Sequence, residues 1–210
     1  DTFLINIDIF NVIADQAHQL DLPLHYQGQL IDTNFAIEAN TDLLKPVGKN
    51  QGYQHLWQKG QSTPEAGLAR VTWLNENGRF YTQTTLTDGT ESFIFTQIGA
   101  NDPNFNLRNE HGFIRRVRGV SQHRFISVLE PHGEYNPSKE FTLNAVSQVT
   151  SLEYSEQGSL SLIEVTVEGR QFLVAINGTE DAQANSTEFS YKNHQYNLDD
   201  RLGVYVLSNH

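Results

Sequence analysis

A short segment near the start of the chain concentrates side chains that can bind metals or move protons. Residues 18–28 read HQLDLPLHYQG. On a regular strand His18 and His25 would point to opposite faces, so a shared metal site with Asp21 would need a bulge, and the spacing matches no zinc signature. We therefore expect both histidines to form hydrogen bonds at a sheet rim, with no metal or other cofactor. The alternative is a self-contained metal enzyme built on these three residues.

A second candidate lies where an apolar strand pattern runs into a polar turn. Residues 125–135 read FISVLEPHGEY. The ends of strands are places where a rigid sheet presents residues to ligands. Glu130, His132 and Tyr135 could act there as an acid, a base or sugar-binding groups. The alternative is that the Glu-Pro-His-Gly sequence only forms a turn, and both interpretations stay open.

Arginines gather in a chain whose formal net charge is −11. This negative charge excludes diffuse attraction to nucleic acid or anionic membranes, so we expect neither as a partner. Period-2 alternation places Arg116 and Arg118 on one face of a strand, near Arg115 and Arg108 in the sequence. A guanidinium binds carboxylates through two parallel hydrogen bonds, as a uronic acid would require. The alternative is that the arginines pair with the protein's own acids.

The elements that must position these residues read as strands. Alternating apolar and polar residues recur between turn dipeptides such as Asn77-Gly78 and Asp88-Gly89. About a dozen strands and no helix of ordinary length predict an all-β fold, a two-sheet antiparallel β-sandwich with long loops. With 210 residues and no change in composition along the chain, residues 1–210 are expected to form a single domain.

Two local features bear on the candidate site. Residues 36–67 lose strand periodicity and predict a long, ordered loop with one possible helical turn, in which Tyr53 and Trp57 could stack on sugars or complete the core. Strands expected near 113–120 and 123–130 would be joined by a short Ser121-Gln122 turn, which would bring Arg116 toward Glu130. Phe10 and Ile13 predict an apolar patch that a partner covers, with self-association as its symptom.

The sequence contains few signals that would indicate the protein's cellular compartment or its processing. The chain has no cysteine, no long apolar run and no signal-peptide pattern. It also has no methionine and begins within a strand pattern, which predicts that it is part of a longer product. Because a chain without thiols fits reducing and oxidising compartments alike, localisation stays open, with a periplasmic or secreted location favoured over the cytoplasm.

Five segments resemble the heparinase II/III-like polysaccharide lyases, in particular their oligoalginate lyase branch. The segments occur in the same order as in that family. They are IDIFNV at residues 7–12, HQLDLPLHYQG at 18–28, GYQHLW at 52–57, LRNE at 107–110 and FISVLEPHGEY at 125–135.

This resemblance implies a C-terminal antiparallel β-region that packs on an N-terminal helical toroid. Members of the family cleave uronate polysaccharides by β-elimination. The carboxylate is neutralised, a base takes the C5 proton and an acid assists departure of the 4-linked oxygen. Since the sequence shows no toroid, we carry over no catalytic or metal residue, and we expect the isolated chain to be inactive.

The expected role is therefore to shape the substrate cleft of a larger lyase. The implied partners are an acidic polysaccharide or oligouronate and the helical toroid of the parent chain. Self-association into a homo-oligomer is expected from the apolar patch at Phe10 and Ile13. A stand-alone carbohydrate-binding module, using the aromatic loops, is the alternative. The residues predicted to face substrate are His18, His25, Tyr53, Arg116, Glu130, His132 and Tyr135.

Overall fold

The computed structural model describes residues 4–98, 110–178 and 186–207, so the predicted arginine at 108 lies outside the described residues. The fold is all-β and antiparallel, as the sequence predicts. Among the described residues, no helix is long and apolar enough to cross a membrane. Where the sequence predicts one domain, the chain divides into two compact units, residues 1–147 and 148–210. Whether they act as a single domain stays a prediction.

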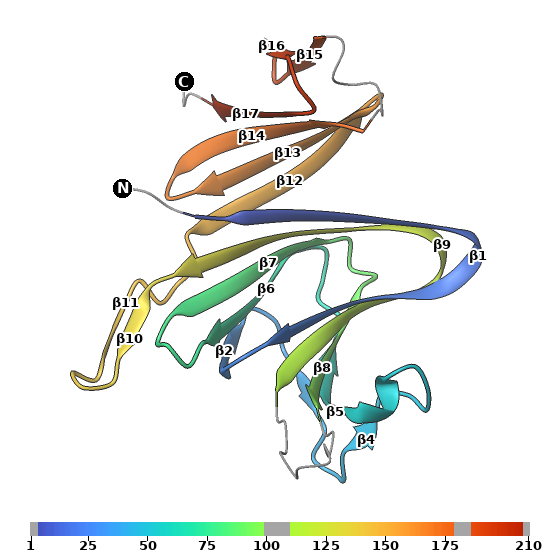
Figure 1. Cartoon of the computed structure of the whole chain (residues 1–210), viewed down its shortest axis with the longest axis vertical. Helices are drawn as coiled ribbons and strands as arrows, with labels where there is room; N and C mark the ends of the chain where they lie inside the picture. Colours follow the sequence, from blue (N-terminus) through green and yellow to red (C-terminus); the bar gives the residue numbers. More distant parts are fainter. Residues whose placement is uncertain (1–3, 99–109, 179–185, 208–210) are drawn as a thin grey trace. The chain divides into compact units, whose positions relative to one another are not determined.

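Two very long strands organise the first unit. Strands β1 (Asn6–Tyr26) and β9 (His111–His132) pair antiparallel from end to end, and Figure 1 shows them curving together. The other elements of this unit are β2 (Gln29–Thr33), β3 (Glu38–Ala39), β4 (Lys45–Pro46), the 3₁₀ turn η1 (Tyr53–His55), β5 (Leu56–Ser62), β6 (Gly67–Leu74), β7 (Phe80–Thr87), β8 (Ser92–Ile98), β10 (Glu134–Asn136) and β11 (Phe141–Leu143).

The long strand pair bends one sheet into two layers. The first part of β9 pairs with β8, which continues to β5, whereas its last part pairs with β7, which continues to β6 and β2. At the bend the register of β1 jumps from Ile13 to His18 while β9 moves only from Gln122 to Val120. Gly119, with φ +72°, is the next irregularity on β9. Bulges of this kind bend strands and increase their twist.

The core of the first unit lies between these layers. Trp73 and Val71 of β6 pack against Phe93 and Phe95 of β8 and Phe113 of β9. Tyr26, at the end of β1, stacks on Trp73 with ring centroids 4.9 Å apart. The core therefore joins strands from both layers and fixes which face of each strand points inward.

The second unit is a four-stranded sheet with a covering hairpin. Its strands are β12 (Val149–Gln157), β13 (Leu160–Val167), β14 (Arg170–Asn177) and β17 (Leu202–Leu207), in that spatial order. The hairpin β15 (Thr187–Tyr191) and β16 (His194–Leu198) contributes Phe189 and Leu198 to a buried cluster with Leu162 and Leu173. This sheet thus buries one face under its own hairpin.

Two local predictions need correction. The expected turn at Ser121-Gln122 does not form, because β9 continues through these residues as a single strand. The segment 36–67 is more regular than expected, since it holds β3, β4 and β5 as well as the predicted helical turn at η1. Its apolar alternation is weak because these short strands lie at the margin of the sheet.

Candidate functional site

Asp21, Tyr53 and Arg116 form a compact polar cluster on the outer face of the β1–β9 pair. The Arg116 guanidinium donates to both carboxylate oxygens of Asp21, from Nε to Oδ1 at 2.8 Å and from an Nη to Oδ2 at 2.7 Å. The Tyr53 hydroxyl donates to Asp21 Oδ2 at 2.5 Å. The Tyr53 ring centroid lies 5.9 Å from the guanidinium carbon. The Asp21 and Arg116 side chains are 8% and 7% exposed, so the pair is nearly closed to solvent.

Electrostatics favours the charged form of this pair. Burial by itself would raise the pKa of Asp21, but the hydrogen bonds from Arg116 and Tyr53 and the charges of Arg116 and Arg118 outweigh it and lower that pKa. Burial, followed by the hydrogen bond to Asp21, raises the pKa of Tyr53. Tyr53 therefore keeps its proton and acts as a hydrogen-bond donor at neutral pH.

The alternative interpretation of the arginines thus holds for two of them. Arg116 already binds Asp21, and Arg115 binds Glu91 in the interior with donor–acceptor distances of 2.7 and 3.1 Å. A uronate that approached Arg116 would meet a carboxylate already in place. Contact between substrate and Arg116 stays a prediction, and the more exposed Arg118, which donates to Gln19 at 3.1 Å, lies on the same face.

Glu130 and His132 form a separate, buried cluster at the other end of β9. They are 4% and 6% exposed. Glu130 accepts a 2.5 Å hydrogen bond from the Ser147 hydroxyl. His132 bonds through Nε2 to the Thr82 hydroxyl at 2.8 Å and through Nδ1 to the backbone oxygen of Asn144 at 2.9 Å.

These partners determine how His132 is protonated when its ring is neutral. A carbonyl oxygen only accepts, so Nδ1 carries the proton and Nε2 accepts from Thr82. The Thr82 oxygen is then free to accept from Thr72, which lies 2.8 Å away. With both nitrogens engaged and the ring stacked on Phe80, His132 ties β9 to β7 and to the segment before the second unit.

The two clusters do not converge, contrary to the expectation from the predicted hairpin. Arg116 and Glu130 are fourteen positions apart along β9, which is about 45 Å of strand path. Phe113 and Leu129 both contact the core between the layers. Residues an odd number of positions away point outward, so Arg116 and Glu130 lie on the outer faces of opposite layers.

The remaining predicted residues lie nearer to solvent. His18 and His25 are exposed on β1, which pairs only with β9 among the described strands. Pro23 is thus on an edge strand, where its missing N–H is tolerated. Tyr135 is 36% exposed, and its backbone N–H donates to Gly78. Within the described part of the chain, the side chains of His18, His25 and Tyr135 form no hydrogen bond with either cluster.

No three His, Asp or Glu side chains among the described residues gather closely enough to hold a metal ion. The register from Gln19 to Tyr26 is regular. Asp21 and His25 therefore share a face, but Asp21 is occupied by Arg116 and Tyr53. The arrangement of Asp21 explains its role better as an anchor for Arg116 than as a metal ligand.

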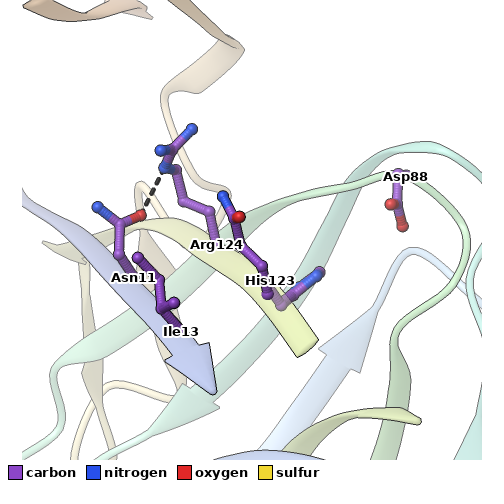
Figure 2. A pocket seen from close by; sticks show the side chains of 6 residues that line it. Asn11, Ile13, Asp88, His123 and Arg124 are labelled. Carbon is purple, nitrogen blue, oxygen red and sulfur yellow. Dashed lines mark hydrogen bonds between the residues drawn. The ribbon is translucent and has the colours of Figure 1, made fainter. Parts of the chain in front are cut away.

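The sequence interpretation missed a buried charge network and the pocket beside it. Glu91 accepts from Arg115 and lies 3.1 Å from His123 Nε2. His123 lines a pocket of about 400 Å³ together with Asp88 and Arg124, and Figure 2 shows Arg124 bonded to an asparagine of β1 at its rim. Arg115 could have indicated this network in the sequence, because period-2 alternation places its charge on the same strand face as the apolar residues Phe113 and Val117.

Comparison with known proteins adds evidence that geometry alone lacks. No family model matches the chain. It is 39% identical over 176 residues to an exo-oligoalginate lyase of Saccharophagus degradans and 35% identical over 184 residues to an alginate lyase of Stenotrophomonas maltophilia. The chain is related to alginate lyases. The matches cover 82% and 88% of this chain but only 24% of each relative.

Proposed function

We propose that this chain is the β-domain of a polysaccharide lyase that cleaves an alginate-like uronate polymer by β-elimination. The observation that carries the proposal is the pair of alginate lyase relatives, each matched over more than four fifths of this chain and about a quarter of its own length. The all-β fold supports it, because a C-terminal antiparallel β-region is typical of the heparinase II/III-like family that the sequence resembles.

Within such a lyase the domain would line the substrate cleft and pack on a helical toroid that supplies the proton-transfer groups. His18, His25 and Tyr135 are the predicted substrate-facing residues that a ligand could reach without rearrangement, because they are exposed. Tyr53 would offer a partly exposed ring above the ion pair of Arg116 and Asp21, which is nearly closed to solvent. Glu130 and His132 are buried, so their contribution to binding would be to hold neighbouring backbone in place.

A lyase assay tests this function directly. β-Elimination creates a C4–C5 double bond whose ultraviolet absorbance reports turnover. We expect the parent protein to release unsaturated oligouronates from alginate, and the chain of residues 1–210 alone to fold but give no product. Turnover by the isolated chain would contradict the proposal that the toroid supplies the proton-transfer groups. A parent protein that is inactive on every uronate polymer would contradict the proposed function.

A further inference from the structure

A pocket of about 610 Å³ opens at the end of the first unit where β1 stops and β9 begins. Strands β1, β2, β3, β5, β8 and β9 all contribute to its wall. Its polar lining consists of Tyr26, Gln29, Lys59, Thr96 and His111. Apolar side chains from Leu30, Ile37 and Phe95 complete it. We refer to it as the Lys59 pocket.

The lining of the Lys59 pocket includes the cation Lys59 and the titratable imidazole of His111, and it includes no acid. Lys59 forms no ion pair with any described residue, although the chain has 25 acidic residues against 14 basic ones. Burial, followed by the positive charge of Lys59, lowers the pKa of His111. The same two groups would be satisfied by a negative charge placed between them. The pocket therefore suits an anion, in a protein that is otherwise strongly negative.

Tyr26 supplies a hydrogen-bond donor in the wall of the Lys59 pocket. Its side chain lines the pocket and is 7% exposed, yet its hydroxyl forms no hydrogen bond with any described residue. The hydroxyl oxygen is not fully closed to solvent, so a ligand in the pocket can reach it. Burial raises the pKa of Tyr26 to about 12, so the hydroxyl is protonated at neutral pH and can donate to a ligand oxygen.

The local backbone explains why Lys59 reaches this place. The register of β5 against β8 shifts between Gln58 and Gly60, which leaves Lys59 as the extra residue of a β-bulge. Bulges turn a side chain away from the direction that regular alternation would give it, and they occur often beside functional sites. Tyr26 is itself held by stacking on Trp73 at 4.9 Å and by the His111 ring at 6.1 Å.

We propose that the Lys59 pocket binds one acidic sugar residue, with its carboxylate at Lys59 and His111 and a ring oxygen or hydroxyl at Tyr26. The apolar wall of Leu30, Ile37 and Phe95 would meet the C–H face of the sugar. Only the identity of the sugar, a uronate, rests on the function proposed above. The pocket then adds a uronate subsite that does not use Arg116, His132 or any other residue predicted to face substrate.

The test measures binding to the chain itself, so its outcome is independent of lyase turnover. Isothermal titration with a uronate trisaccharide should give saturable binding that weakens with added salt. Lys59→Met should reduce the affinity about tenfold or more, as expected for loss of a charged hydrogen-bond partner. Lys139→Met, at an exposed lysine between β10 and β11, is the matched control and should bind as the original protein does.

Nuclear magnetic resonance of the imidazole of His111 gives a second readout. A bound carboxylate should move the titration of His111 to higher pH, because a negative charge beside the imidazole favours its protonated form. Loss of this shift in Lys59→Met, with an unchanged melting temperature, would support the proposal.

Three results would overturn it. They are equal binding of the carboxyl-reduced neutral trisaccharide, full affinity in the Lys59→Met protein, and inorganic phosphate binding as tightly as the sugar, which would show a general anion site. Binding to the Lys59 pocket combined with a parent protein that never cleaves uronates would instead remove the proposed function and leave the pocket intact.

Discussion

Replacing Arg116 by alanine should destabilise the first unit. Arg116 and Asp21 face each other directly across the β1–β9 pair. After the substitution the Asp21 carboxylate, 8% exposed, keeps only the hydroxyl of Tyr53 and a 3.3 Å contact to Gln19. A buried carboxylate without its cation is unfavourable because its desolvation is no longer offset.

The magnitude follows from this burial. Breaking a buried ion pair by removing one partner costs about 3–5 kcal/mol. Tyr53 still donates to the carboxylate and β1 is an edge strand, so we expect the low side, about 2–4 kcal/mol. For a protein of this size that corresponds to a melting temperature about 4–16 °C lower. The closed Asp21–Arg116 pair therefore predicts a clearly lower melting temperature for this variant.

Urea denaturation followed by the fluorescence of the buried Trp73 measures the loss. Arg118→Ala is the control, because Arg118 is exposed and bonds only to Gln19, and it should cost less than about 1 kcal/mol. A midpoint for Arg116→Ala equal to that of Arg118→Ala would refute the reasoning.

The same pair has a pH signature. The pKa of Asp21 is lowered in the folded state, so its stabilising contribution is complete above the unfolded value of about 3.9 and is lost as the pH falls through the lower folded value. Acid unfolding of the original protein should therefore begin below about pH 4 in part through this group. Arg116→Ala should weaken that dependence, and an unchanged acid profile would argue against the pair.

The remaining predictions concern buried groups and one surface. Glu91→Gln should cost about 3–5 kcal/mol in urea denaturation, because it leaves Arg115, 1% exposed, without its carboxylate. His132→Ala should lower the free energy of unfolding by at least about 1–3 kcal/mol, because Thr82 and the Asn144 carbonyl lose their partner. A variant as stable as the original protein would show that His132 does not stabilise the fold. Phe10 and Ile13 are 48% and 79% exposed, so changing both to serine should reduce any self-association seen in sedimentation.

The sequence was most informative where signals are local. Asn77-Gly78 and Asp88-Gly89 predicted the turns around β7, and both glycines adopt positive φ angles there, +81° and +87°. The alternation also predicts strands at residues 68–74, 79–86 and 91–98, and the bounds of β6, β7 and β8 differ from these by about one residue. These features depend on a few adjacent residues, so they could be recognised without knowing what packs on them.

Long-range pairing could not be obtained in this way. Ser121-Gln122 resembles a turn because polar residues and Gly119 interrupt the apolar pattern, yet pairing with β1 across the bend keeps β9 continuous. Asp21 and Arg116 are 95 residues apart in the sequence. Only the register of β1 on β9 brings them together, and a shift of one residue would send Asp21 to the opposite face.

The segment 36–67 illustrates a different relation between pattern and function. Its length and loss of periodicity predicted a long, ordered loop, although much of it forms short strands. Tyr53 from η1 closes the Asp21–Arg116 cluster, and Lys59, a few residues further on, leaves the β5 ladder at a bulge to line the end pocket. The sequence is irregular here because the side chains of Tyr53 and Lys59 point in directions that a regular strand would not allow. Because β5 pairs with β8, which in turn pairs with the first half of β9, both places depend on the same layer, whereas His132 belongs to the other one. A ligand held by Lys59 would therefore meet the Tyr53 layer through β5 and β8 and the other layer through β2, at a pocket whose lining does not include His132.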